Sequence, residues 1–191
     1  NNRGYDGPET ARHIMRHANL NVTLEGTDQQ LGDHYDPSSH TVRMSPDVAS
    51  RPSVASMAIV AHELGHAQQH QDGSPLIIAR NLLLPAVQIG PTISYGLIFA
   101  GLIFNFIGLA WLGVGLFAIS VLFMILTLPV EIDASMRALK LLDASDLVQN
   151  EAERGGARQV LTAAALTYVA AAITSILNLL YYVSLVTRSR D

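Results

Sequence analysis

The chain has 191 residues, and only 15% of them are charged, against roughly 25% in ordinary globular proteins. Hydrophobic residues make up 49%, which suits a small domain joined to membrane helices. The net charge of −4 gives no reason to expect nucleic acid as a partner, and the absence of cysteine excludes disulfides and thiolate metal ligands. Any bound metal must therefore be held by histidine, aspartate or glutamate.

The N-terminal part of the chain predicts a small region with both helix and strand. Residues 8–18 suit a helix that begins with a proline and has apolar side chains at helical spacing. Residues 21–24 favour a short strand. A turn-rich segment, 33–39, precedes residues 40–45, in which polar and apolar side chains alternate. We therefore expect a small sheet that contains a hairpin.

The most informative stretch is His62-Glu63-Leu64-Gly65-His66, which reads H-E-x-x-H. Local signals predict a helix over residues 54–71, with a serine cap before it and strong stop residues after it. On such a helix His62 and His66 lie one turn apart on one face, so both imidazoles can bind one metal ion. Glu63 projects beside that face, where a carboxylate can take a proton from water bound to zinc. The alternative is a chance match on a soluble helix, which the apolar residues around the motif disfavour.

Two long uncharged runs follow the motif. Residues 81–130 contain no Lys, Arg, Asp, Glu or His, which is too long for one soluble core helix and suits two membrane spans. We expect these spans at about 92–109 and 111–130, joined by a tight turn. Residues 159–187 form the second uncharged run and suit a third span. The alternative, a large soluble core, is disfavoured because soluble helices rarely tolerate so many uncharged residues in sequence.

The motif supplies two metal ligands, whereas a catalytic zinc normally has three from the protein. His70 continues the histidine stripe, but it lies about 12 Å from His62 along the helix axis, too far to share one ion. Glu131 is favoured because a charge placed directly after the apolar run is costly unless it faces water, a partner or a metal. The alternative for Glu131 is an ordinary charge at the membrane surface. Asp133 is a candidate to orient a ligand histidine from outside the coordination sphere.

The order of the motifs resembles a known group of membrane peptidases. The H-E-x-x-H motif followed by Glu131-Ile132-Asp133-Ala134 resembles the pattern of gluzincin membrane peptidases of the HtpX and CAAX-prenyl-protease type. A closer resemblance, over nearly the whole chain, is to the YugP-type neutral zinc metallopeptidases of bacteria. Four segments carry it in order: Asp33-His34-Tyr35-Asp36-Pro37, Ala61-His62-Glu63-Leu64-Gly65-His66-Ala67, Leu128-Pro129-Val130-Glu131-Ile132-Asp133-Ala134-Ser135 and Ala163-Ala164-Ala165-Leu166-Thr167-Tyr168-Val169-Ala170.

This resemblance implies a zinc site with three ligands and one catalytic base: His62, His66 and Glu131, with Glu63 as the base. It also implies an N-terminal membrane helix that this chain lacks. Since the chain starts without Met and without a signal-like segment, we expect that a further segment precedes it. Ser135 departs from the HtpX-type pattern, which has Asp at this position. We therefore expect another group, such as Asp133, to take the role of that Asp outside the coordination sphere.

Peptide hydrolysis also needs a donor that stabilises the oxyanion. His34, Tyr35 and Tyr168 are candidates by their chemistry, and packing or turn formation is the alternative for each. The strand predicted around residues 41–44 is a candidate to offer its edge to an extended substrate, with a plain structural hairpin as the alternative.

We therefore predict an α+β chain that is mainly α, with a zincin-like catalytic unit and about three transmembrane helices. Four parts are expected along the chain. They are residues 1–80, the catalytic part; 81–130, a transmembrane hairpin; 131–158, the third-ligand helix (to about residue 142) and a polar segment; and 159–187, a C-terminal transmembrane helix.

The predicted function is that of a zinc-dependent endopeptidase, multi-pass in the cell membrane, which hydrolyses peptide bonds of membrane or membrane-proximal proteins. A protein substrate and the bilayer are the expected partners, and an oligomer or a regulatory membrane partner stays open. One alternative is a non-proteolytic membrane adaptor or assembly factor with structural zinc. Another is an intramembrane site-2-type protease, although the polar residues 68–72 place the motif at an interface. Basic residues flanking the hairpin favour a cytoplasmic active site, and Arg188 and Arg190 weaken that prediction.

Overall fold

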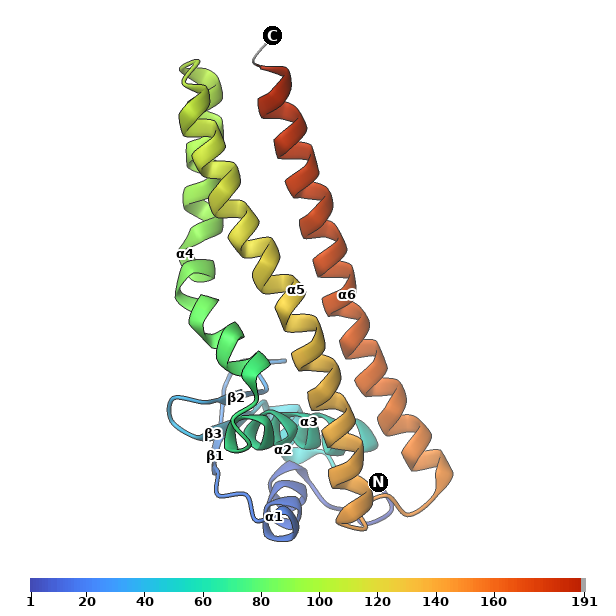
Figure 1. Cartoon of the computed structure of the whole chain (residues 1–191). Helices are drawn as coiled ribbons and strands as arrows, with labels where there is room; N and C mark the ends of the chain where they lie inside the picture. The colour runs from blue at the N-terminus through green and yellow to red at the C-terminus, as the bar shows by residue number, and fades with distance from the viewer. Residues whose placement is uncertain (190–191) are drawn as a thin grey trace. The chain divides into compact units, whose positions relative to one another are not determined.

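The computed structural model describes residues 1–189, except for the side chains of residues 85 and 86. The described chain is mainly helical, with a small mixed sheet of three strands, as Figure 1 shows. It forms two compact units. The first consists of Asn1–Ser74 and Glu131–Ala165, and the second consists of Pro75–Val130 and the chain from Leu166 onward. The prediction of a mainly α chain with a small sheet is confirmed.

Helix α1 (Gly7–Ala18) opens the first unit. It begins with a capping box, in which the Asp6 carboxylate accepts from the Glu9 N–H and the Glu9 carboxylate accepts from the Asp6 N–H. The helix buries Ala11 and Ile14 in the core of the unit. The helix predicted at residues 8–18 is confirmed.

The sheet contains β1 (Thr23–Gly26), β2 (His34–Asp36) and β3 (Thr41–Met44), in the order β1-β3-β2. Strands β2 and β3 pair antiparallel and form the predicted hairpin, whereas β1 pairs parallel with β3. Since β3 is the central strand, it has no free edge, and the prediction that residues 41–44 offer an edge to substrate is wrong. The strand order depends on long-range pairing, which strand composition alone does not reveal.

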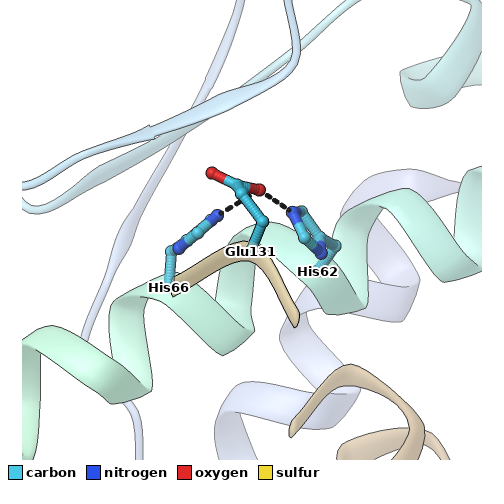
Figure 2. A group of neighbouring side chains, drawn as sticks. All are labelled: His62, His66 and Glu131. Carbon is cyan, nitrogen blue, oxygen red and sulfur yellow. Dashed lines mark hydrogen bonds and ion pairs between the residues drawn. The ribbon is translucent and has the colours of Figure 1, made fainter. Parts of the chain in front are cut away.

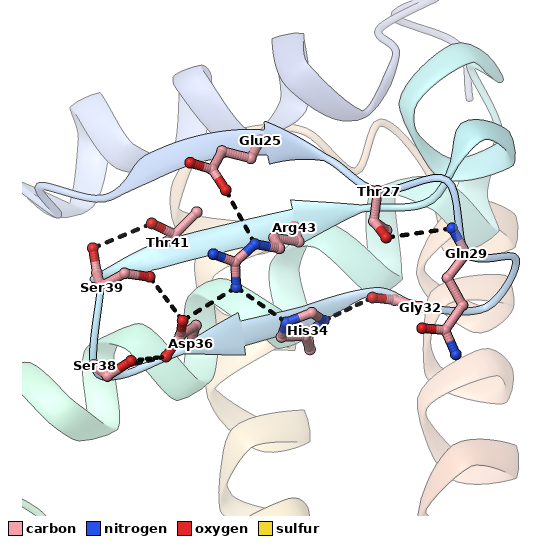
Figure 3. Close-up of polar contacts among 10 residues, drawn as sticks. All are labelled: Glu25, Thr27, Gln29, Gly32, His34, Asp36, Ser38, Ser39, Thr41 and Arg43. Atoms are coloured by element: carbon pink, nitrogen blue, oxygen red, sulfur yellow. Dashed lines mark hydrogen bonds and ion pairs between the residues drawn. The ribbon is translucent and has the colours of Figure 1, made fainter.

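Arg43 joins all three strands on one face of the sheet (Figure 3). From β3 its guanidinium donates to Glu25 on β1 at 3.0 Å and to Asp36 on β2 at 3.1 Å. Its Nη1 also lies 3.4 Å from Nε2 of His34. Asp36 additionally accepts from Ser38 and Ser39, and these hydrogen bonds together with Arg43 hold the pKa of Asp36 well below its usual range. The short hairpin is thus fixed by charge as well as by backbone pairing.

Helix α2 (Pro46–Ser50) leads into α3 (Val54–Gln71), the helix that carries the H-E-x-x-H motif. Ser53 caps α3, because its hydroxyl accepts from the Ser56 N–H at 3.0 Å. Both predicted ends of this helix are confirmed. Within the first unit α3 contacts α1, α2, β2 and β3, and Met57 and Leu64 are buried in the shared core.

The first unit is completed by residues 131–144 of α5 (Ile107–Ala144) and 151–165 of α6 (Glu151–Arg188). Ala138, Leu142 and Leu161 bury their side chains in the same core as α3. The expectation that a separate helix begins at residue 131 is wrong, because α5 runs through Pro129 without ending. Apolar helices tolerate proline where neighbouring groups satisfy the freed backbone.

The second unit contains α4 (Pro75–Ile103), the apolar part of α5 and the end of α6. Helices α4 and α5 are joined by a turn in which Asn105 has a φ of 56°. A Cβ added at Gly113 would lie 2.7 Å from the Ser94 carbonyl oxygen, so the two helix backbones pack in close contact. The span predicted at 92–109 runs past the end of α4 at Ile103 and includes the turn, whereas the span predicted at 111–130 lies within α5.

Two helices of the described chain, α5 and α6, are long and apolar enough to cross a membrane. The number becomes three if Pro75–Leu84 and Val87–Ile103, which bend by 49° relative to each other, count as one span. Large apolar side chains lie more than half exposed on the second unit, as expected for helices that contact lipid: Leu82, Ile103, Phe104, Phe106, Leu112 and Leu180. About three membrane helices were expected, and the structure supports two or three.

Candidate metal centre

Three predicted ligands meet in the first unit (Figure 2). Helix α3 places the imidazoles of His62 and His66 on one side, with ring centroids 4.8 Å apart. From α5, Oε2 of Glu131 lies 3.1 Å from Nε2 of His62 and 3.4 Å from Nε2 of His66. Donor atoms bound tetrahedrally to zinc are about 3.3 Å apart, given bonds of about 2.0–2.1 Å. These two separations are close to that value, and all three donor atoms lie within 4.8 Å of one another, so the group is suited to a zinc ion. Among the described residues this is the one group of three or more His, Cys, Asp or Glu that could hold a metal.

The close packing of α3 against α5 explains how Glu131 reaches the two histidines. A Cβ on Gly65 would lie 2.6 Å from the carbonyl oxygen of Ala134, so only glycine allows the two backbones to approach this closely. Ala134 itself is fully buried. Gly65 therefore makes room for the backbone of α5.

Each ligand histidine is oriented by a partner at its other ring nitrogen. Nδ1 of His66 lies 2.9 Å from Oε1 of Gln69, and Nδ1 of His62 lies 3.3 Å from Oγ of Ser135. Assigning the proton to Nδ1 satisfies both hydrogen bonds and leaves the Nε2 lone pairs directed toward Glu131. In this tautomer both histidines are suited to bind a metal through Nε2. Ser135, which looked like a departure from the HtpX-type pattern, itself contacts a ligand histidine.

The partner of His66 is held by a chain of polar side chains. The amide nitrogen of Gln69 donates to Asp133 at 2.8 Å, and Asp133 accepts from Nε of Arg137 at 2.8 Å. Arg137 also donates to Asp72 at 2.6 Å. Asp133 thus reaches the histidine through Gln69 rather than directly. The sequence prediction missed Gln69, although its position three residues after His66 places it on the same helix face.

The carboxylate of Glu63 is buried beside the ligands and is fixed by β2. Its Oε2 accepts from the backbone N–H of Tyr35 at 2.8 Å. The Tyr35 side chain points elsewhere, since its hydroxyl lies 3.0 Å from Nδ1 of both His40 and His70. Burial, together with the charge of Asp36, raises the pKa of Tyr35 to about 12. Sequence reasoning considered the Tyr35 side chain and missed the backbone contact, which has no residue-type signature.

The charge balance of the site favours a cation. Burial alone would lower the pKa of His66, but the hydrogen bond that its protonated ring donates to Glu131, together with the negative charge of Glu63, outweighs burial and raises that pKa. Two carboxylates therefore surround the imidazoles with negative charge, which attracts either a proton or a divalent ion to His66.

Comparison with known proteins agrees with this geometry. The sequence matches the family described as "Putative neutral zinc metallopeptidase" over residues 1–187. It is also 38% identical over 189 residues to the "Putative membrane protease YugP" of Bacillus subtilis (strain 168), covering 98% of this chain and 84% of that protein. The chain belongs to this family of zinc metallopeptidases. No solved structure matches the chain.

Membership in a zinc metallopeptidase family implies Zn²⁺, and the group of His62, His66 and Glu131 is a site suited to it. The ligand set has the form of a catalytic zinc site, in which three protein ligands leave a fourth position for water. Glu63 neighbours these ligands in the sequence and is held in place by Tyr35. The arrangement can therefore hold a metal and offer a carboxylate base beside it.

The remaining residues predicted to assist the chemistry lie in different surroundings. His34 is exposed, and its Nδ1 lies 2.7 Å from the carbonyl oxygen of Gly32 (Figure 3). Tyr168 lies on α6 in the second unit, three residues beyond the part of α6 that belongs to the first. A role for either residue as an oxyanion donor stays a prediction.

Proposed function

We propose that this family member is a zinc-dependent membrane endopeptidase in which His62, His66 and Glu131 bind Zn²⁺ and Glu63 is the general base. The observation that supports it best is the convergence of the three donor atoms within 4.8 Å of one another, from two helices that are far apart in the sequence. The buried carboxylate of Glu63 beside them supplies the group that peptide hydrolysis needs.

The mechanism follows from the positions of the side chains. Zinc, when bound, supplies a Lewis acid that polarises a carbonyl and makes bound water acidic. Glu63 accepts the proton from the attacking water and later delivers it to the leaving amine. Before substrate binds, the Tyr35 N–H holds one carboxylate oxygen of Glu63 in place. Gln69 and Ser135 keep the two imidazoles in the tautomer that directs Nε2 to the ion.

The substrate would bind as an extended chain along β2. Strand β2 is at the edge of the sheet, and its central residue, Tyr35, contacts Glu63. Extended peptides bind to sheet edges through their backbone groups, which would bring a scissile bond to the catalytic base. The helix with the metal motif, the neighbouring edge strand and the ligand from a later helix together support a zincin-like unit. The division of the chain into a catalytic part, a transmembrane hairpin, a third-ligand segment and a C-terminal transmembrane helix, with boundaries at residues 80, 130 and 158, is part of this proposal.

The apolar helices support a multi-pass location in the cell membrane, with membrane or membrane-proximal proteins as substrates. We place the active site on the cytoplasmic side. Basic residues concentrate near the catalytic segments, which the positive-inside tendency assigns to the cytoplasm: Arg80, Arg137, Lys140, Arg154 and Arg158. Arg188 opposes this assignment, and Arg190 lies outside the described residues.

Two other functions fit the observations less well. An intramembrane protease would carry its metal motif on a membrane helix, whereas α3 is not among the candidate spans of the described chain and packs against the sheet. A membrane adaptor with structural zinc would have no need of a buried carboxylate tied beside the metal ligands, which Glu63 provides.

The test compares the wild-type protein with Glu63→Gln in detergent, using an extended membrane-protein fragment as substrate. We expect the variant to lose at least about 100-fold in cleavage rate while it keeps the zinc content of the wild type, because the carboxylate acts on protons rather than on the metal. A Glu131→Ala variant should bind one zinc ion fewer per chain than the wild type and should lose activity. Unchanged cleavage by Glu63→Gln would refute the protease function, and a zinc content in Glu131→Ala equal to that of the wild type would refute the ligand set.

A further inference from the structure

A second group of side chains of the kinds that can bind metals lies in the first unit, and it shares no residue with the ligands of the proposed catalytic zinc. Tyr35 is on β2, His40 is in the turn between β2 and β3, and His70 is in the last turn of α3. The Tyr35 hydroxyl lies 3.0 Å from Nδ1 of each histidine. The two imidazole rings have centroids 4.8 Å apart, the same separation as in the pair of His62 and His66.

Hydrogen bonds join the three side chains. A hydroxyl has one hydrogen, so Tyr35 can donate to at most one of the two imidazoles and can accept from the other. When Tyr35 donates, the lone pair of the accepting nitrogen points at the hydroxyl. Burial raises the pKa of the Tyr35 hydroxyl, and the negative charge of nearby Asp36 adds to that rise.

We propose that Tyr35, His40 and His70 form a second binding site for a divalent transition-metal ion of the zinc and copper class. Imidazole nitrogen is a favoured ligand of Zn²⁺, Cu²⁺ and Ni²⁺, and a phenol oxygen can complete the set. The donor separations of 3.0 Å lie between the roughly 2.8 Å of a square-planar ion and the roughly 3.3 Å of a tetrahedral one. Binding through the phenolate would release the proton of Tyr35 to solvent, so the affinity of this site should rise with pH.

An ion at this site would tie the turn of the β2–β3 hairpin to the end of α3. Tyr35 links this site to the proposed catalytic base. Its side chain belongs to the second metal site, and its backbone N–H donates to the carboxylate of Glu63. His40 has a φ of 52°, a backbone conformation in which histidine is found more often than most residues. The His40 ring lies close to the ring of His70 on α3, with centroids 4.8 Å apart. The second ion would therefore fix the strand along which we place the substrate.

The test uses the full-length Glu131→Ala protein in detergent, because this variant lacks a ligand of the first site. Equilibrium dialysis against Zn²⁺ alone, and then against Cu²⁺ alone, is followed by elemental analysis. We expect one ion per chain, and for Cu²⁺ an electron paramagnetic resonance spectrum with coupling to imidazole nitrogen. Adding His40→Asn or His70→Gln should weaken binding by more than the roughly 10–100-fold that the loss of an outer-shell partner causes. Asparagine at position 40 keeps the preference for positive φ.

His34→Gln is the matched control, because His34 is an exposed histidine on the same hairpin that contacts Gly32 and Arg43 instead. It should retain the second ion. The inference is overturned if Glu131→Ala takes up no ion, or if His40→Asn and His70→Gln bind it as tightly as their parent. Circular dichroism confirms that each variant is folded. None of these measurements depends on proteolysis, so failure here is distinct from failure of the proposed protease function.

Discussion

Replacing Gly65 by alanine tests whether the contact between α3 and α5 sets the geometry of the metal site. The added Cβ would lie 2.6 Å from the Ala134 carbonyl oxygen, whereas ordinary contacts begin at 3.4 Å. Helix α5 must therefore recede by about 0.8 Å, and Glu131 moves with it. Metal–ligand distances tolerate deviations of only about 0.2 Å, so this shift is several times too large. We expect zinc affinity to fall at least about tenfold, which is about 1.4 kcal/mol.

The assay is competition for zinc with a chromogenic chelator in detergent, combined with chemical unfolding of each protein. Overpacking should cost about 1–3 kcal/mol of stability, partly offset by up to about 1 kcal/mol from the better helix propensity of alanine. Gly155→Ala is the control, because Gly155 is exposed on α6 and an added Cβ meets no atom within 4 Å. This control should keep its zinc affinity. A folded Gly65→Ala protein that binds zinc and cleaves like the wild type would refute the reasoning.

Three further predictions follow from the contacts around the site. Gln69→Leu should lower zinc affinity about 10–100-fold in the same chelator competition, while Gln68→Leu should not, and equal effects would remove the positioning role of Gln69. After metal removal with a chelator, protonated His66 should stabilise the protein through Glu131. Because the folded-state pKa of His66 is raised, this stabilisation should be complete at acid pH and lost as pH rises through the raised pKa, which unfolding at a series of pH values would show. The pKa of Tyr35, raised to about 12, should make stability fall by about 1 kcal/mol as pH rises from about 10 to 12. Tyr35→Phe should abolish that alkaline loss, and an unchanged alkaline loss in this variant would contradict it.

The sequence predicted well the features that local signals determine. The bounds of α3 follow from the Ser53 cap and the stop residues after Gln71, both of which act within one turn of the helix end. The pairing of His62 and His66 follows from helical spacing alone. Glu131 could be predicted because it is the first charge after 50 uncharged residues, a position that needs a specific partner.

Other features could not be predicted because they depend on contacts between distant segments. Strand β3 is central because β1 pairs with it. The turn-rich segment between these two strands does not indicate beside which strand β1 will lie. The contact of Glu63 with β2 uses a backbone N–H, which every residue except proline possesses. Gly65 gave an ambiguous signal, since glycine permits close approach without indicating which group approaches. The helix end expected before Glu131 was wrong because a proline in an apolar helix need not end it.

The backbone amide of Tyr35 has two competing uses. In this structure it donates to Glu63, and because it points away from β3 it is also the donor that an incoming peptide would need in order to pair with β2. Our hypothesis is that peptide pairing displaces the carboxylate from this amide, so that the base is released only when a chain has occupied the strand edge. The amide resonance of isotopically labelled Tyr35 should then shift when an uncleavable peptide binds to the wild type, and a resonance that stays unchanged with the peptide bound would argue against this exchange of partners.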